Sequence, residues 1–344
     1  MREPILVTGV AGFIGFHLAR RFLADGWAVL GIDNLNDYYD PHLKRARVRE
    51  LKNHPKFHFQ RCDIADRSAV SKLFAAHRFD FIVHLAAQAG VRYSLEHPHA
   101  YADCNLIGFL NVLEGCRQRG CEHLIYASSS SVYGANARMP LRSLDNTDHP
   151  ASFYGATKKA NEVMAYSYSS LFGIAVTGLR FFTVYGPWGR PDMAIWLFTE
   201  AIQQGSPLKL FNDGRLSRDF TYIDDVTEAV SRLLTRPPRP DPAGESRRDA
   251  GSGRAPSILY NVGNSHPVEV NEVVRLIEDA VGRQAIREYL PLQPGDVLET
   301  SADCTDLEGA VGFRPNTPLR EGIRLFVEWF QAFHAAPPAR RARV

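Results

Sequence analysis

The sequence predicts a doubly wound parallel α/β sheet followed by a smaller α/β part. Short apolar runs alternate with helix-forming segments from residue 1 to about residue 183, and this order builds a parallel sheet with helices on both faces. The first run, residues 5–7, leads into a glycine-rich turn, and the second, residues 28–32, ends in Asp33. Together these observations indicate a nucleotide-binding sheet of the Rossmann type.

The turn after the first run carries three glycines at three-residue spacing. In a dinucleotide-binding sheet the first glycine allows a tight turn, the second lets the backbone approach a diphosphate, and the third lets the helix pack on the strand. An ordinary strand-to-helix turn could use three glycines for packing alone. We predict that the whole turn binds a cofactor, namely Gly9, Gly12, Phe13, Ile14 and Gly15.

Asp33 follows eighteen residues after Gly15, where such a fold places the carboxylate that accepts hydrogen bonds from the adenosine ribose. A carboxylate would repel a 2′-phosphate, and no arginine follows it directly, so we predict NAD in preference to NADP. Asn34, the next residue, is assigned to the same site. The polar segment 34–51 is expected to form a loop and a short exposed helix whose charges face solvent.

Two later strand ends extend the predicted cofactor site. The strand at residues 57–61 is followed by Asp63 and Ile64. The carboxylate could accept from the adenine amino group, although a helix N-cap explains it equally well. The strand at residues 79–85 ends in small residues, which leave room for a ligand at the carboxyl edge of the sheet. We therefore add Leu85, Ala86, Ala87 and Gln88 to the cofactor site.

Tyr154 and Lys158 stand four positions apart in a segment with helical periodicity, so their side chains share one face of a helix. A free tyrosine has a pKa near about 10, and a neighbouring ammonium would favour the phenolate and make it a usable base near neutral pH. The lysine could also hold a ribose. Such a pair also occurs by chance on exposed helices, so its assignment depends on the surroundings.

Four serines, residues 128–131, follow the strand at residues 124–127 and precede Val132-Tyr133-Gly134. A hydroxyl at this sheet edge, which we assign to Ser129, could hydrogen-bond the substrate oxygen that Tyr154 deprotonates. A turn with capping hydroxyls is the structural alternative, and it does not account for all four serines. Which of the four is catalytic stays open.

These motifs, in this order, resemble the extended short-chain dehydrogenase/reductase superfamily, in particular its nucleotide-sugar epimerase branch. The resemblance covers about residues 3–332 and rests on Thr8-Gly9-x-x-Gly12-Phe13-Ile14-Gly15, on the serines ending in Val132-Tyr133-Gly134, and on Tyr154-x-x-x-Lys158. It implies that Tyr154 is the base, that Lys158 lowers its pKa and binds the nicotinamide ribose, and that Ser129 orients the hydroxyl.

Within that branch the chain is similar to UDP-glucuronate 4-epimerases in segments 84–94, 180–194 and 293–297. Related 4,6-dehydratases and the decarboxylase carry acidic residues directly after the catalytic hydroxyl, where this chain has Ser130 and Ser131. UDP-galactose 4-epimerases have an asparagine where Thr183 stands and an arginine where Gln293 stands. The resemblance therefore implies a 4-epimerase that acts on an acidic sugar.

The implied reaction is NAD-dependent C4 epimerisation of UDP-glucuronate to UDP-galacturonate. Tyr154 takes the proton of the sugar 4-hydroxyl while C4 passes a hydride to NAD, the 4-keto intermediate turns over within the site, and the hydride returns to the opposite face. A UDP-galactose 4-epimerase and a UDP-glucuronate decarboxylase remain as alternatives. A non-catalytic NAD-sensing protein is a further alternative, because fold does not fix function.

The substrate site is assigned from side-chain chemistry and from the resemblance. Thr183, the serine hydroxyls and Arg190 would bind a carboxylate, because hydrogen bonds to a charged acceptor are stronger than neutral ones. Arg218 is assigned to the diphosphate and Asp296 to the uridine side or its ribose, with surface ion pairing as the alternative for both. The predicted substrate-binding residues are Arg92, Ser128, Ser129, Ser130, Thr183, Arg190, Arg218 and Asp296.

Composition excludes several classes of partner. Forty basic and thirty-eight acidic residues give a net charge of +2, which is too balanced to indicate nucleic acid or a membrane surface. Five scattered cysteines without a C-x-x-C pair, and twelve histidines without zinc-like spacing, indicate reduced thiols and no metal. Met1 leads directly into the first strand and no apolar run could span a bilayer, so we expect a cytoplasmic protein.

We divide the chain into an NAD-binding domain, residues 1–183, and a nucleotide-sugar-binding part, residues 184–332, with residues 258–263 returning to the large sheet. The proline-, glycine- and charge-rich stretch 236–257 is expected to be a flexible insertion, and residues 333–344 a disordered tail. The family resemblance also implies a homodimer, which the long helices expected at residues 98–120 and 152–172 could form.

Overall fold

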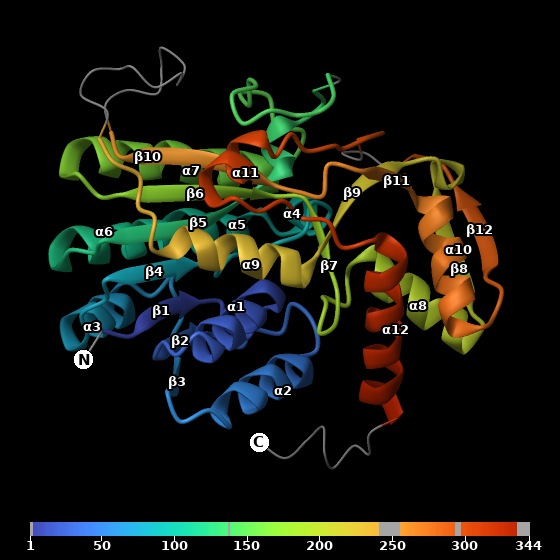
Figure 1. Ribbon diagram of the computed structural model, residues 1–344, viewed down its shortest axis with the longest axis horizontal. Coiled ribbons are helices and arrows are strands. Elements are labelled where there is room, and N and C mark those ends of the chain that lie inside the picture. The colour runs from blue at the N-terminus through green and yellow to red at the C-terminus, as the bar shows by residue number, and fades with distance from the viewer. Residues whose placement is uncertain (1–2, 137, 241–254, 293–296, 336–344) are drawn as a thin grey trace.

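The computed structural model describes residues 3–136, 138–240, 255–292 and 297–335. In this part of the chain a parallel sheet of seven strands has the order β10-β6-β5-β4-β1-β2-β3 (Figure 1). The predicted doubly wound parallel sheet is therefore confirmed. Its strands are β1 (Ile5–Thr8), β2 (Val29–Asp33), β3 (Phe57–Arg61), β4 (Phe81–His84), β5 (His123–Ser129), β6 (Val176–Phe181) and β10 (Ser257–Val262).

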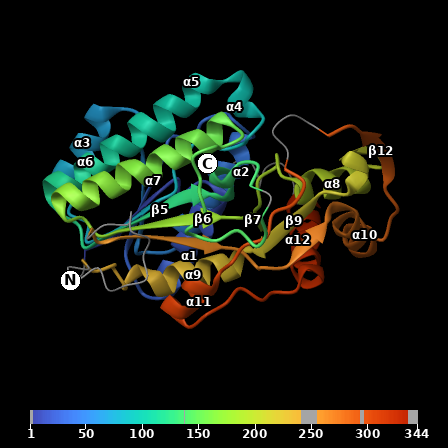
Figure 2. The same ribbon diagram turned by 90° about the horizontal axis from the view of Figure 1, so that it is seen from above.

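Helices cover both faces of this sheet, as Figure 2 shows. One face carries α3 (Arg67–Ala76), α6 (Phe109–Arg119) and α7 (Phe153–Phe172), and the other carries α1 (Phe13–Ala24), α9 (Ile223–Leu234) and α11 (Thr305–Val311). Helix α2 (Pro41–Lys52) packs against α1. Val7 packs in the core beneath α1, whereas its neighbour Leu6 packs in the core beneath α6. Successive strand residues point to opposite faces, so a sheet covered on both sides needs strands that are apolar throughout.

The strand order reverses beside β1, because β2 and β3 lie on one side of β1 and the chain then crosses to β4 on its other side. Doubly wound folds bind ligands in the crevice at such a point. The backbone is tightly packed here. A Cβ atom on Gly9, whose φ is +70°, would lie 2.7 Å from the backbone nitrogen of Ala86, and one on Gly15 would lie 2.2 Å from the carbonyl oxygen of Gly9. Glycine is therefore required at both positions.

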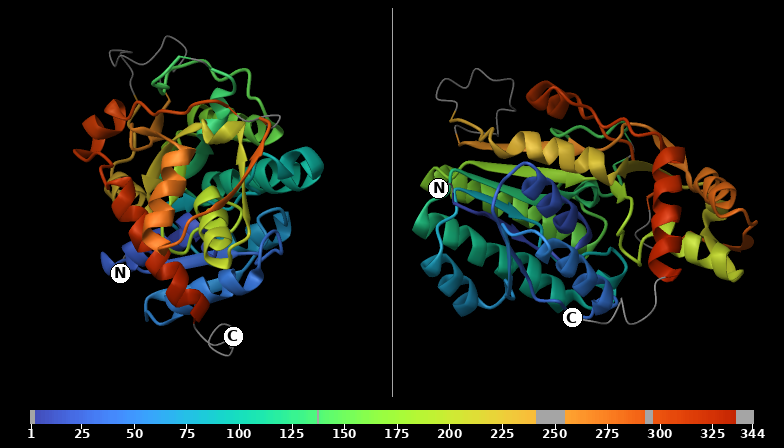
Figure 3. Two further views of the ribbon diagram at one scale, coloured as in Figure 1. Left: turned by 90° about the vertical axis from the view of Figure 1, so that its right-hand side faces the viewer. Right: turned by 60° about the horizontal axis from the view of Figure 1, so that its bottom comes forward.

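The smaller part lies beyond the carboxyl edge of the large sheet (Figures 1 and 3). A three-stranded sheet contains β11 (Pro267–Glu269), β9 (Ser217–Tyr222) and β7 (Thr183–Tyr185), and β8 (Pro207–Phe211) pairs in parallel with β12 (Ile286–Leu290). Helix α10 (Val270–Val281) packs between α8 (Ala194–Gln204) and α12 (Leu319–Ala335). In the described ranges no helix is both long enough and apolar enough to cross a membrane.

The division of the chain at residue 183 remains a prediction. Segments that follow this residue contribute to both parts, because β10 pairs with β6 and α9 packs against α1. Residues 241–254 of the predicted insertion and residues 336–344 of the predicted tail lie outside the described residues. The tail prediction is wrong at its start, since α12 continues to Ala335.

The single helix expected at residues 98–120 consists of three segments: α5 (Pro98–Tyr101), a π-helical turn (Ala102–Gly108) and α6. The side chain of Asn105, in the π-helical turn, accepts from the backbone N–H of Gln88 at 2.8 Å and donates to its carbonyl at 3.0 Å. Such turns often occur near functional sites. Here the turn ties the helix to the segment that follows β4.

Candidate active site

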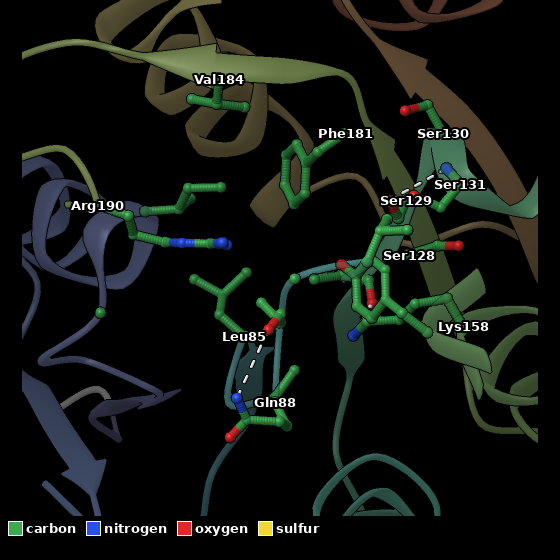
Figure 4. A pocket seen from close by; sticks show the side chains of 18 of the residues that line it. Leu85, Gln88, Ser128, Ser129, Ser130, Ser131, Lys158, Phe181, Val184 and Arg190 are labelled. Carbon is green, nitrogen blue, oxygen red and sulfur yellow. Dashed lines mark hydrogen bonds between the residues drawn. The ribbon is translucent and has the colours of Figure 1, made fainter. Parts of the chain in front are cut away.

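A cavity of about 440 Å³ opens at the carboxyl ends of β1, β4, β5 and β6 (Figure 4). This volume lies in the range of small-molecule sites. Most residues predicted from the sequence to form the site line this cavity. They are Gly9, Gly12, Phe13, Ile14, Gly15, Asp33, Asn34, Ile64, Leu85, Ala86, Ala87, Gln88, Ser128, Ser129, Ser130, Tyr154, Lys158, Thr183, Arg190 and Arg218.

Two of the predicted site residues, Arg92 and Asp63, do not line the cavity. The guanidinium of Arg92 lies over the ring of Phe211, 4.4 Å from its centroid. The carboxylate of Asp63 accepts from Nδ2 of Asn34 at 3.0 Å and from the backbone N–H of Ala65 at 2.9 Å. Each side chain therefore has protein partners of its own outside the cavity wall. Asp296 lies outside the described residues.

The end of the cavity beside β1 fits a dinucleotide. Helix α1 begins after Gly12 with no side-chain cap and no acidic residue in its first turn, so the N–H groups at its start are available to an anion. The carboxylate of Asp33 accepts from the backbone N–H groups of Ala11 at 3.1 Å and Leu35 at 2.8 Å. Burial raises the pKa of Asp33. The two bonds hold this carboxylate at the end of β2, beside the glycine-rich turn.

Lys44 of α2 also lines the cavity and was not predicted from the sequence. It is 5% exposed, and its ammonium donates to the backbone carbonyl of Asn36 at 2.7 Å. The expectation that the charges of segment 34–51 face solvent is wrong for Lys44 and for Arg47, which is 0% exposed. Their three-residue spacing on a helix, which places both side chains on one face, is the signal that could have identified them.

Tyr154 and Lys158 reach the cavity from the start of α7. The helix begins after Ser152, whose hydroxyl accepts from the N–H of Gly155 at 3.0 Å and so caps the first turn. Nζ of Lys158 donates to the carbonyl of Ala127 in β5 at 3.0 Å. Burial lowers the pKa of Lys158 to about 8. The helix cap and the bond to β5 therefore fix where this pair enters the cavity.

The pKa of the Tyr154 phenol is raised above its ordinary value, although influences of both signs act on it. Burial raises it, whereas a hydrogen bond with Ser129 and the positive charge of Arg190 lower it. Lys158 is not among the groups that shift it, and the ammonium of Lys158 donates to the carbonyl of Ala127. The lowering of the Tyr154 pKa by Lys158 thus remains a prediction for the cofactor-bound protein. In this structure Ser129 and Arg190 are the groups that favour the phenolate.

The four serines at the end of β5 and directly after it have different partners; Ser128 and Ser129 are the last residues of this strand. The hydroxyl of Ser128 donates to Oε1 of Glu162 at 2.6 Å, so its proton is directed into the protein. Oγ of Ser129 lies 3.2 Å from Oγ of Ser131 and accepts from the backbone N–H of Ser131 at 3.2 Å. Ser129 is also the serine that lowers the pKa of Tyr154, and its catalytic role stays a prediction.

A buried ion pair between Arg180 and Glu162 supports the segment that carries the four serines, residues 128–131. Nε and Nη2 of Arg180 donate to the two carboxylate oxygens of Glu162 at 2.8 and 2.9 Å, and the two side chains are 3% and 4% exposed. Nη1 of Arg180 also donates to the hydroxyl of Tyr133 at 3.0 Å. Because the same Glu162 accepts from Ser128, the ion pair connects α7, β6 and the segment that carries the four serines. Sequence analysis missed this network, because its four residues, Glu162, Arg180, Ser128 and Tyr133, come from a helix, two strands and a turn.

Arg190 faces the cavity from the side opposite Ser129 and Lys158 (Figure 4). Its Nε and Nη2 donate to the two oxygens of Asp192 at 2.9 and 2.5 Å, and Asp192 also accepts from the hydroxyl of Tyr38 at 3.0 Å. Burial raises the pKa of Asp192, but the Arg190 guanidinium outweighs this and holds it below its ordinary value. Among the described residues Nη1 has no hydrogen-bond partner, so this nitrogen is available to a ligand.

Three comparisons with known proteins agree with this geometry. The model of the NAD dependent epimerase/dehydratase family matches residues 5–245. The chain is 46% identical over 327 residues to the probable UDP-glucuronate 4-epimerase of Rhizobium meliloti, covering 94% of this chain and 96% of that protein.

Two solved structures are similar along almost the whole chain. The UDP-glucuronic acid 4-epimerase of Bacillus cereus, in complex with UDP-glucuronic acid and NAD, has a TM-score of 0.85 at 31% identity, covering 96% of this chain and 99% of that one. The UDP-glucose 4-epimerase of Thermotoga maritima, with UDP-glucose, has a TM-score of 0.84 at 30% identity with the same coverage. The chain belongs to the NAD dependent epimerase/dehydratase family, and the resemblance seen in its motifs is confirmed.

The pKa of Lys158 leads to a prediction about stability and pH. Its folded value of about 8 lies below the ordinary 10.5, so the folded protein carries the full cost of the buried charge below pH 8. That cost disappears as the pH rises toward 10.5, and stability rises over this interval. Relative to Lys158→Met, the unaltered protein should gain roughly 2–3 kcal/mol in free energy of unfolding between about pH 7 and pH 10.

Urea unfolding of both dinucleotide-free proteins across this pH range measures the difference. If the difference in free energy of unfolding between the two proteins stays constant with pH, the lowered pKa of the buried Lys158 is contradicted.

Proposed function

We propose that this member of the NAD dependent epimerase/dehydratase family inverts C4 of UDP-glucuronate to give UDP-galacturonate. The observation that carries the proposal is that one cavity joins the glycine-rich turn, the Tyr154–Lys158 pair and Arg190. The relatives named above include a probable UDP-glucuronate 4-epimerase and a solved epimerase in complex with UDP-glucuronic acid and NAD. Site geometry and relatives therefore support the same reaction.

The β1 end of the cavity would hold NAD. The start of α1 is available to the diphosphate, Asp33 would accept from the adenosine ribose, and the small side chains after β4 leave room for the rings. Lys158 would donate to the nicotinamide ribose. When bound, NAD supplies the oxidant for C4 of the sugar and afterwards the reductant.

Tyr154 is the proposed base. Its Oη would take the proton from the 4-hydroxyl of the sugar and return it in the second half of the reaction. The hydroxyl of Ser129, whose hydrogen bonding lowers the pKa of Tyr154, would hold the same substrate oxygen. Since burial alone disfavours the phenolate, this hydrogen bond and the charge of Arg190 are what the chain supplies to stabilise it.

The donors around the sugar favour an acidic substrate. Nη1 of Arg190, with Thr183 and the hydroxyl of Ser130, would bind the sugar carboxylate. No carboxylate side chain follows Ser129, since the next residues are Ser130 and Ser131. A carboxylate held by several donors is less free to leave as carbon dioxide, which argues for epimerisation over decarboxylation. Arg218 of β9 would approach the diphosphate.

A neutral sugar is the second candidate substrate, and two observations favour it. Arg190 already forms a bidentate pair with Asp192, which satisfies much of its charge. The solved structure with UDP-glucose is also about as similar to this chain as the one with UDP-glucuronic acid. A UDP-galactose 4-epimerase would use the same Tyr154, Lys158 and Ser129.

A proton NMR time course tests the proposal. The purified protein is mixed with UDP-glucuronate, and separately with UDP-glucose, and no NAD is added. Galacto C4 signals from UDP-glucuronate alone are expected, and inversion of UDP-glucose would support the second candidate.

Tyr154→Phe should lower turnover by at least about 100-fold, because a positioned base contributes on that order, while NAD remains bound. The control is Tyr168→Phe on the same helix, α7. It removes a hydroxyl that donates to Glu114 of α6. Near-normal turnover by Tyr154→Phe would falsify its assignment as the base.

Arg190 provides a test of substrate choice. Arg190→Gln should reduce kcat/KM for UDP-glucuronate by roughly 10- to 100-fold, the value of a hydrogen bond to a charged group. The loss for UDP-glucose should be smaller, because it reflects only the charge that Arg190 places near Tyr154 and no carboxylate contact. Steady-state kinetics with both substrates measure the two losses. Equal losses would argue against a carboxylate role.

We also propose that the protein forms a homodimer through α7 and the helical segment that contains α6. These helices lie side by side on one face of the large sheet (Figure 2). Large apolar side chains on them are exposed, among them Val163 at 57%, Leu171 at 71% and Ile107 at 48%, and such patches mark interaction sites. Sedimentation velocity should show a dimer that Val163→Glu weakens. A monomer at micromolar concentration would rule it out.

A further inference from the structure

The guanidinium of Arg47 in α2 is fully buried, with 0% of the residue exposed. Its Nη1 donates to the carbonyl of Ala11 at 2.8 Å and to the hydroxyl of Tyr39 at 2.7 Å. Its Nη2 donates to the carbonyls of Trp188 at 2.7 Å and Gly189 at 3.0 Å. All four acceptors are neutral, so these bonds fix geometry and do not form an ion pair.

These four acceptors belong to segments far apart in the sequence. Ala11 lies in the glycine-rich turn that would face the cofactor diphosphate, whereas Trp188 and Gly189 directly precede Arg190. A planar guanidinium presents its donors in a fixed fork, so one rigid group sets the separation of these two segments. Arg47 therefore links the segment that directly precedes Arg190 to the glycine-rich turn.

Other contacts show that the segment before Arg190 is held in a conformation it would not adopt alone. Trp188 has a φ of +61°, which is uncommon for a bulky residue and must be stabilised by its surroundings. Its ring packs against Phe16 of α1 and Trp329 of α12, with centroids 5.2 and 5.3 Å away.

His17 of α1 adds a further hydrogen bond to this segment. Its Nε2 lies 2.8 Å from the carbonyl of Pro187, and burial lowers the pKa of His17 to about 3. The ring is therefore neutral at physiological pH and donates from Nε2. Helices α1, α2 and α12 together hold residues 187–189, and Arg47 is the member of this set that also reaches the cofactor turn.

We propose that Arg47 is a positioning residue that sets the distance between the Arg190 guanidinium and the cofactor turn, and that it thereby contributes to selection of an acidic sugar. The inference rests on the proposed function, because it assigns to Arg190 the sugar carboxylate. Arg47 does not line the cavity, so it acts only through the segment it holds. A loss of its geometry should change which sugar is bound well before it changes how much NAD is held.

Arg47→Lys tests this, because it keeps the positive charge but loses the fork that serves four oxygens. The variant should retain NAD within about twofold, bind UDP-glucuronate at least about tenfold more weakly by calorimetry, and bind UDP-glucose within about threefold. Arg45→Lys, an exposed position on the same helix, is the matched control and should change neither affinity. Equal losses for both sugar nucleotides, or no loss, would overturn the proposal.

A double-mutant cycle separates positioning from general structural damage. If Arg47 acts through Arg190, then Arg47→Lys should have no further effect on UDP-glucuronate affinity in an Arg190→Gln background. An additive loss would show that Arg47 acts independently and would overturn the proposal. If Arg190→Gln alone leaves UDP-glucuronate affinity unchanged, the proposed acidic-sugar function fails. If Arg190→Gln weakens UDP-glucuronate more than UDP-glucose but Arg47→Lys weakens both equally, the proposed function stands and only the role of Arg47 is overturned.

Tyr39→Phe is a milder variant for the case that Arg47→Lys does not fold. It removes one of the four oxygens that hold the guanidinium and keeps the ring. UDP-glucuronate affinity relative to UDP-glucose should fall by about threefold, and the fall should vanish in the Arg190→Gln background. Unchanged selectivity, or a fall that persists without Arg190, would overturn the proposal.

Discussion

The site depends on one constraint, which is that parallel strands all end at the same edge of their sheet. The segments after β1, β4 and β5 are spread over more than a hundred residues of chain, yet they meet there. Because the strand order reverses beside β1, the helices diverge and leave a crevice. The turn after β1 can border that crevice only because Gly9 has no Cβ atom. The backbone of Ala86 lies too close to Gly9 to leave room for one.

Buried polar groups give this edge its fixed geometry. The Arg180–Glu162 pair holds Ser128, Asn105 holds the backbone of Gln88, and the carbonyl of Ala127 holds Lys158. An apolar core would fill the same space without fixing directions, whereas a buried hydrogen bond tolerates little change in angle and is costly to break. The price of desolvating these groups is offset by a site whose donors already point in set directions before a ligand arrives.

The smaller part supplies the groups that we propose to distinguish one sugar from another. Arg190 and Arg218 come from segments after β7 and in β9, and they reach a cavity whose opposite wall belongs to the large sheet. The pairing of Arg190 with Asp192 reduces the net charge offered to a substrate but leaves Nη1 in place. In the proposed function, selection of the sugar depends on where this guanidinium lies, and contacts from α1, α2 and α12 hold the segment that precedes it.

Local patterns in the sequence determined the sheet, the glycine-rich turn, Asp33, the small residues after β4 and the shared face of Tyr154 and Lys158. Each depends on spacing within one strand, turn or helix, so neighbouring residues are enough to specify it. The tertiary structure decided which side chains find partners across the fold. It buried Lys44 and Arg47, turned the proton of Ser128 toward Glu162, and left Arg92 and Asp63 outside the cavity wall. Those outcomes depend on segments far apart in the chain, and on the cost of burying a polar group without a partner, which no short sequence pattern records.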